Sequence, residues 1–153
     1  MQMANLFNQD FIEFIDALNK ENVEYILVGG YAVILHGYTR TTADMDVWVN
    51  KTTDNYLRLS KAYERFGAPI FSEHEFFEGK NDVWGIGMEP FRIEILNKIK
   101  GVSFDEAYNI CQSFIQENVA VKYINLKHLL QAKEAAGRYK DKDDIEQLTK
   151  SKG

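Results

Sequence analysis

Apolar residues recur along the chain with two different periods, and these periods predict an alternation of helices and strands. Between residues 6 and 20, phenylalanine, isoleucine and leucine occur at spacings of three and four, which is typical of one face of an amphipathic helix. The apolar run Tyr-Ile-Leu-Val at 25–28 is short and is followed by two glycines, so it predicts a buried strand that enters a tight turn. A short helix over 31–36 is expected to follow.

The middle of the chain carries a second strand and a longer helix. Residues 44–49 include Met45, Val47, Trp48 and Val49 and predict a strand. The apolar positions of 53–66 predict a helix that begins with a cap at its first residue and ends at a glycine. The stretch 71–82 mixes acidic and aromatic residues without a clear period, so we interpret it as an irregular connection.

Strands and helices continue to alternate in the second half of the chain. Two strands over 83–88 and 91–96 are expected to pair through a hairpin turn at Glu89–Pro90. The pattern then predicts a helix over 104–114 and a last strand over 119–124.

Helical periodicity dominates the end of the chain. The segment 126–136 predicts a helix, and Asp143 and Glu146 have the spacing of a capping box for a last short helix. The C-terminal helical segment should therefore cover about 125–150. With 153 residues, the chain has the length of one domain, and we predict a single α/β (α+β) unit over 1–153, in which a small mixed β-sheet is flanked by helices.

Composition narrows the classes of protein that this sequence can encode. Hydrophobic residues make up 45% and aromatic residues 13% of the chain, which is enough apolar material for a folded interior. The single cysteine, Cys111, has no internal disulfide partner, which favours a reducing, cytoplasmic location. We expect no membrane association, because no apolar run approaches the length of about 20 residues that a spanning helix needs. The net charge of -5 disfavours a protein that coats nucleic acid nonspecifically.

Carboxylates interrupt two of the expected strands. Alternate residues of a strand point to the same side, so Asp44 and Asp46 should point together. Two such charges about 4 Å apart repel by roughly 1 kcal/mol in water and by about 4 kcal/mol at an effective dielectric near 20. If the strand that carries Glu94 is a neighbour in the same sheet, the three acids converge, and they form a natural Mg²⁺ site because hard divalent cations take oxygen ligands.

The order of these motifs resembles a known superfamily. Gly-Gly at 29–30, Asp-Met-Asp-Val at 44–47 and Ile-Glu-Ile at 93–95 resemble the signature of the nucleotidyltransferase superfamily that includes DNA polymerase β. Arg-Thr-Thr-Ala-Asp-Met-Asp, followed near the end by Lys-Glu-Ala-Ala-Gly-Arg-Tyr-Lys-Asp, is more specifically similar to small bacterial nucleotidyltransferase-like proteins. These include relatives of the AbiEii abortive-infection toxins and of the lincosamide nucleotidyltransferases. The resemblance covers roughly residues 22–150.

The resemblance implies an ATP-binding or other NTP-binding enzyme that uses two Mg²⁺ ions. Asp44 and Asp46 would bind both ions against the triphosphate, and Glu94 would ligate the catalytic ion and help to activate an acceptor hydroxyl. Gly29 and Gly30 would let backbone N–H groups approach the phosphates. Gly30 replaces the serine that many relatives carry, and Glu94 stands where many have aspartate.

Three further residues are candidates for nucleotide binding. Arg40 and Thr42 precede the acid pair and can contact phosphate or brace the carboxylates, and for Arg40 a structural ion pair with Asp44 or Asp46 is the alternative. Lys133 falls within the apolar stripe of its helix, so its ammonium either extends outward to solvent or points into a cleft toward an anion, for which we favour the triphosphate.

Two classes of function remain open from the sequence. The first is a nucleotidyltransferase that acts on a hydroxyl acceptor such as a tRNA end, a protein side chain or a small molecule. The second is a catalytically weak nucleotide-binding or regulatory module of a toxin-antitoxin or abortive-infection system, which acts through a cognate antitoxin or another partner protein. Nucleotide incorporation separates an enzyme from a module that binds nucleotide without turnover.

Overall fold

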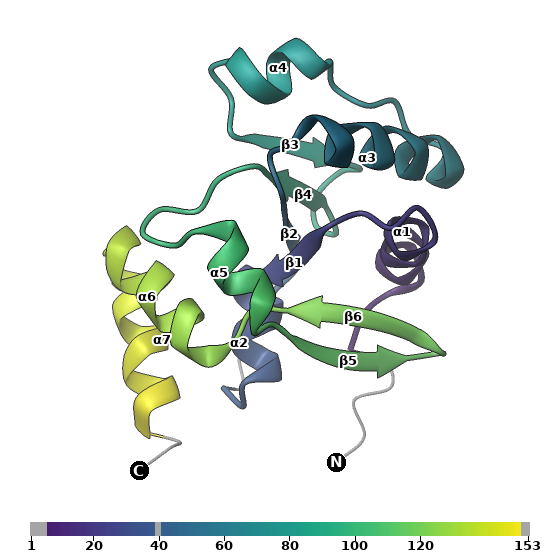
Figure 1. Ribbon diagram of the computed structural model, residues 1–153. Helices are drawn as coiled ribbons and strands as arrows, with labels where there is room; N and C mark the ends of the chain where they lie inside the picture. The colour runs from purple at the N-terminus through teal and green to yellow at the C-terminus, as the bar shows by residue number, and fades with distance from the viewer. Residues whose placement is uncertain (1–5, 39–40, 151–153) are drawn as a thin grey trace.

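The computed structural model describes residues 6–38 and 41–150, and these residues form a mixed α/β structure with a six-stranded sheet and seven helices (Figure 1). The predicted class, a mixed sheet flanked by helices, is confirmed. The strands are β1 Tyr25–Val28, β2 Met45–Val49, β3 Val83–Ile86, β4 Ile93–Leu96, β5 Gln112–Gln116 and β6 Val119–Tyr123. The helices are α1 Gln9–Lys20, α2 Gly29–Leu35, α3 Thr53–Phe66, α4 Glu73–Glu78, α5 Phe104–Asn109, α6 Leu126–Ala136 and α7 Tyr139–Lys150.

The strand order places β2 inside the sheet, between two strands that are distant from each other in the sequence. The order is β3-β4-β2-β1-β6-β5, so β2 lies between β1 and β4 although more than forty residues separate β2 from β4 in the sequence. The β2–β4 and β1–β6 pairs are parallel, and the other three pairs are antiparallel. The antiparallel pairing of β3 with β4 confirms the expected hairpin, although both strands are shorter than predicted.

Side chains that alternate along the strands build one apolar cluster on each face of the sheet. On one face, residues such as Leu27 and Val47 pack with helices α1 and α3, for instance against Phe14 and Leu59. On the other face, Trp48 belongs to a second cluster. That cluster includes Ile26, Val28, Ala32, Val33, Leu129 and Leu148, which come from β1, α2, α6 and α7. The candidate acids lie on this second face, since Asp46 and Trp48 are two residues apart.

Capping residues account for the elements whose bounds the sequence predicts most closely. The Asn125 side chain accepts a hydrogen bond from the backbone N–H of Lys127 at the start of α6, and Gly137 ends that helix in the left-handed conformation. Helix α3 is capped by Thr52, one residue before the predicted cap, and ends at Gly67 with φ +94°. These helices therefore match the predicted ranges 126–136 and 53–66.

Three segments differ from the prediction. A short helix, α4, occupies part of the stretch interpreted as irregular, with Ser72 as its cap. The helix predicted over 104–114 ends at Asn109, and the remainder becomes strand β5. The last helix begins at Tyr139, so Asp143 and Glu146 lie inside α7 and form no capping box. Among the described residues, no helix is long and apolar enough to cross a membrane.

Candidate active site

The two strands that carry the candidate acids are neighbours. In the parallel β2–β4 pair, Asp46 lies directly opposite Glu94, and Asp46 is also opposite Val28 at the end of β1. The predicted juxtaposition of these two carboxylates from distant parts of the chain is therefore confirmed. Both side chains are partly exposed, so they are available to a ligand from the second face of the sheet.

Asp44 extends the acid group toward the hairpin between β3 and β4. It directly precedes β2, and the backbone N–H of Arg92 donates a hydrogen bond to Oδ1 of Asp44 at 3.3 Å. The next residue, Met45, donates its own N–H to the carbonyl of Arg92 at 2.9 Å. The ladder between the strands thus continues as far as Asp44 and holds its carboxylate two positions from Asp46.

The electrostatic environment of Asp46 shows that the three acids act on one another. The pKa of Asp46 is raised from its ordinary value to about 7, chiefly by burial and then by the charges of Glu94 and Asp44. Lys140 and Lys133 lower it by a smaller amount. A cation bound between Asp44, Asp46 and Glu94 would stabilise them, because it would compensate their mutual repulsion.

The two glycines at the start of α2 make room for this arrangement. Gly29 has φ +71°, and the carboxylate of Asp46 occupies the space that a Cβ on Gly29 would need. A Cβ on Gly30 would instead collide with the hydroxyl of Thr42. These contacts place Gly29, Gly30 and Thr42 beside the acids, whereas Arg40 lies outside the described residues.

Substitution of Gly29 by alanine tests this close approach. We expect Gly29→Ala to lower the free energy of unfolding by about 1–3 kcal/mol, because alanine is strained at this positive φ and its Cβ meets the Asp46 carboxylate. Urea unfolding measures the change. Gly37→Ala is the matched control, since Gly37 also has positive φ but, apart from its chain neighbours, no atom of residues 6–38 or 41–150 lies within 4 Å of its Cβ position. A loss equal to that of the control would mean that the contact with Asp46 contributes nothing.

A cavity of about 400 Å³ opens beside the acids on the second face of the sheet. Its walls combine the acids Asp46 and Glu94 and the two glycines with apolar residues of β1, β4 and α6. A third acid, Asp141, also lines the cavity, together with five cationic side chains: Lys98, Lys100, Lys133, Arg138 and Lys140. The cavity is therefore rich in positive charge, although the whole chain has a net charge of -5.

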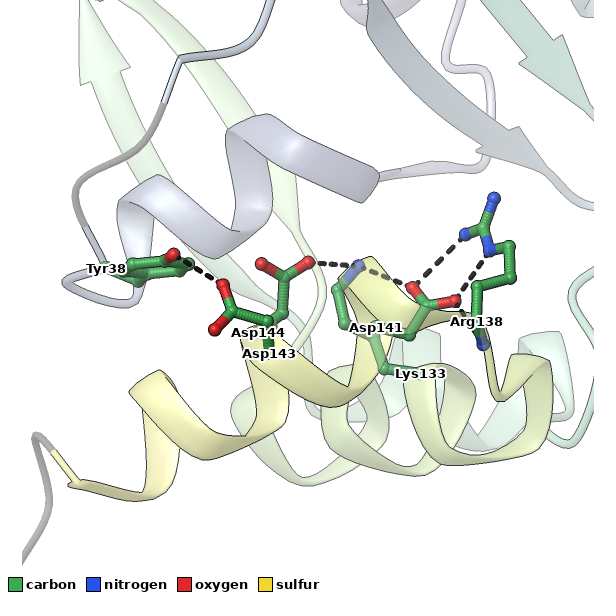
Figure 2. Close-up of polar contacts among 6 residues, drawn as sticks. All are labelled: Tyr38, Lys133, Arg138, Asp141, Asp143 and Asp144. Atoms are coloured by element: carbon green, nitrogen blue, oxygen red, sulfur yellow. Dashed lines mark hydrogen bonds and ion pairs between the residues drawn. The ribbon is translucent and has the colours of Figure 1, made fainter.

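Lys133 is buried in the apolar stripe of α6, and its ammonium is paired inside the protein (Figure 2). Its Nζ lies 3.2 Å from Oδ1 of Asp141 and 3.0 Å from Oδ2 of Asp144. The hydrophobic pattern by itself would place Asp141 and Asp144 on a solvated turn and helix, but both are buried. The interpretation in which Lys133 extends outward to solvent is therefore wrong. Lys133 does line the cavity, and its contact with a nucleotide stays a prediction.

Arg138 completes this ion cluster at the start of α7. Its Nε donates to Oδ2 of Asp141 at 2.6 Å, and its backbone N–H donates to the same oxygen at 3.2 Å. Burial by itself raises the pKa of Asp141, but the hydrogen bonds from Arg138 and Lys133 outweigh it and leave that pKa below its ordinary value. Next to the cluster, the Tyr38 hydroxyl donates to Asp143 at 2.9 Å and links the residues after α2 to α7 (Figure 2).

Several residues beside the acids were not predicted from the sequence. Glu89, in the hairpin, has a pKa raised by desolvation and by a hydrogen bond with Asp44. The guanidinium of Arg92 lies over Gly85, where a Cβ would collide with it. Lys98, Lys100 and Lys140 were also missed, because they come from a loop and a helix end. Alternation along the strand signals only Arg92, which is two residues before Glu94.

The oxygen ligands of the site suit Mg²⁺ better than a softer metal. Within residues 6–38 and 41–150, no three histidine, cysteine, aspartate or glutamate side chains are gathered closely enough to hold a metal by themselves. Mg²⁺ commonly binds through one or two carboxylates and completes its shell with water and substrate phosphates. Asp46 and Glu94, facing each other beside the cavity, fit that mode of binding.

Comparison with known proteins agrees with a nucleotidyltransferase-like fold. The crystal structure of a provisionally assigned nucleotidyltransferase from Thermotoga maritima is similar to this one, with a TM-score of 0.55 and 14% sequence identity over 92% of this chain and 91% of that chain. More particularly, the chain belongs to the family described as nucleotidyltransferase of unknown function (DUF6036), whose profile matches residues 5–151. No curated protein matches this sequence.

Proposed function

We propose that this protein is a Mg²⁺-dependent nucleotidyltransferase that moves a nucleoside monophosphate from an NTP to a hydroxyl acceptor. The observation that carries the proposal is the register of β2 and β4, which sets Asp46 opposite Glu94 at the edge of a cationic cavity. The family and the fold support the same class of reaction. Acceptors that offer such a hydroxyl are a tRNA end, a protein side chain and a small molecule.

The residues of the site have distinct roles in this proposal. The acceptor hydroxyl oxygen attacks the α-phosphorus, the bond from that phosphorus to the bridging oxygen breaks, and pyrophosphate leaves with the electron pair. Glu94 receives the hydroxyl proton and passes it to water, and Asp44 and Asp46 fix the geometry of the donor. Bound Mg²⁺ would supply the positive charge that the phosphates and the three acids require. Gly29 and Gly30 let the donor approach the backbone at the start of α2.

A second candidate is a nucleotide-binding or regulatory module with weak chemistry. The observation that favours it is the absence, within the described residues, of three metal-holding side chains already in place. Such a module would act through a partner protein, as an antitoxin-controlled element of a toxin-antitoxin or abortive-infection system does. The finer resemblance to AbiEii toxins and lincosamide nucleotidyltransferases supports either candidate equally.

Transfer of label from α-labelled NTPs tests the proposed activity. We expect label to appear on an acceptor, with release of pyrophosphate, in Mg²⁺ but not in EDTA, when the full chain is offered tRNA, protein and aminoglycoside or lincosamide acceptors in turn. The variant Glu94→Gln should lose this transfer, whereas Glu64→Gln, exposed on α3 at the opposite face, should retain it. Binding of NTP without transfer to any acceptor would favour the module.

A further inference from the structure

The cationic side chains of the cavity divide into two groups. Lys133 and Arg138 are already held by the buried acids Asp141 and Asp144. In contrast, Lys98, Lys100 and Lys140 are exposed, and each lacks an ion pair within the part of the chain that the structure describes. These three lysines are therefore the charges in the cavity that are free to meet a ligand.

The loop that carries Lys98 and Lys100 is anchored at both ends. On one side, the buried side chain of Asn97 donates to the carbonyl of Phe76 at 2.7 Å. On the other side, Gln131 of α6 donates to the carbonyl of Gly101 at 2.6 Å. Between the two lysines, Ile99 packs against the second apolar cluster. The backbone thus holds both lysines at the cavity wall before any ligand binds.

We propose that Lys98 and Lys100, together with Lys140 from α7, form the subsite for the β- and γ-phosphates of the donor nucleotide, a proposal that rests on the proposed function. Two Mg²⁺ ions would balance the charge of a triphosphate but would leave the three carboxylates Asp44, Asp46 and Glu94 uncompensated. Three lysines supply this remaining positive charge.

The direction of β4 then sets the orientation of the donor nucleotide in the cavity. Arg92 precedes Glu94 by two residues and Lys98 follows it by four, so the hairpin and the lysine loop lie on opposite sides of Glu94 along the strand. With the β- and γ-phosphates at the lysine loop, pyrophosphate leaves on that side. Because attack and departure are in line, the acceptor hydroxyl approaches from the side of Arg92 and the hairpin.

Nucleotide affinity as a function of phosphate number tests the subsite. The double variant Lys98→Gln/Lys100→Gln is compared with the wild type for ATP, ADP and AMP by calorimetry in Mg²⁺, with inorganic tripolyphosphate as a competitor. We expect ATP to bind about 10- to 100-fold more weakly to the variant, ADP to lose less, and AMP to change less than about twofold. Tripolyphosphate should displace ATP from the wild type and should itself bind the variant more weakly.

The control is Lys51→Gln/Lys61→Gln, which removes two exposed lysines, one before and one within α3 on the opposite face, and should leave all three affinities unchanged. Circular dichroism confirms that both double variants are folded. An equal loss for ATP and AMP, no loss for ATP, or no binding of ATP to the wild type would overturn the subsite. Transfer of label by the wild type with an unaltered ATP affinity in the variant would refute the subsite alone. A phosphate-dependent loss without transfer to any acceptor would instead refute the proposed enzyme.

Discussion

The variant Asp46→Asn is expected to lose nucleotidyl transfer by at least about a thousandfold while becoming more stable than the wild type in metal-free buffer above pH 7. The activity loss follows from removing a carboxylate that faces Glu94 at the centre of the proposed site, since positioned charge is commonly worth about 10²–10³ in rate for one group and metal loss adds to it. The stability gain has a separate cause, because the folded protein buries this carboxylate and also holds it beside Glu94 and Asp44.

The sign of the pH effect follows from the raised pKa of Asp46. That pKa is about 7 in the folded protein and about 4 in the unfolded chain, so the folded state binds the proton more tightly between these values. The contribution of Asp46 therefore reduces stability progressively as pH rises from about 4 to about 7, and the reduction is complete above pH 7. After a discount for solvent screening, we expect Asp46→Asn to gain about 1–3 kcal/mol at pH 8 and nothing at pH 4.

Thermal unfolding of both proteins at pH 4 to 8, in EDTA and in Mg²⁺, measures these effects. Mg²⁺ should stabilise the wild type more than the variant, because binding to the folded state adds to its stability. The matched control is Asp82→Asn, an exposed residue before β3, which should leave both the activity and the pH profile unchanged. A variant that is less stable than the wild type at pH 8 without metal would show that burial and the neighbouring acids do not destabilise the ionised Asp46.

Local pattern in the sequence was sufficient for elements with a strong apolar face or a clear cap. Strand β1 is four buried residues in a row, and α6 is bounded by Asn125 and Gly137, so both occupy the predicted ranges. Pattern was insufficient for α4, whose six residues are too few to show a helical period. It also failed for β5, which has mostly exposed side chains and lies beside β6 at one edge of the sheet.

Helix α7 shows why part of the candidate site could not be read from hydrophobic pattern. Asp141, Asp144 and Leu148 are its buried residues, at spacings of three and four, so two of the three inward positions carry charge. A search for apolar periodicity interprets such a helix as a solvated segment. The relevant information is the partner, Lys133, whose place in the apolar stripe of α6 does indicate a buried charge that needs an anion.

Replacement of Lys133 by methionine is expected to lower the free energy of unfolding by about 3–5 kcal/mol at pH 7, a large part of the roughly 5–15 kcal/mol that stabilises a typical domain. The side chains of Lys133, Asp141 and Asp144 are 8%, 1% and 3% exposed, so the substitution leaves two buried carboxylates without their shared ammonium. Arg138 still bonds to Asp141, but its side chain is mostly exposed. Urea unfolding at constant ionic strength measures the loss.

Two comparisons identify the buried charge as the cause. Lys127→Met, on the exposed side of the same helix, should change stability by less than about 0.5 kcal/mol. The triple variant Lys133→Met/Asp141→Asn/Asp144→Asn should recover much of the loss, because neutral amides are less costly to bury than carboxylates that have lost this ammonium. In the wild type the lowered pKa of Asp141 contributes stability that is present above its unfolded pKa and is lost as pH falls through its folded pKa, so the deficit of Lys133→Met should shrink below about pH 4. A Lys133→Met deficit no larger than that of Lys127→Met would mean that water, not Lys133, satisfies Asp141 and Asp144.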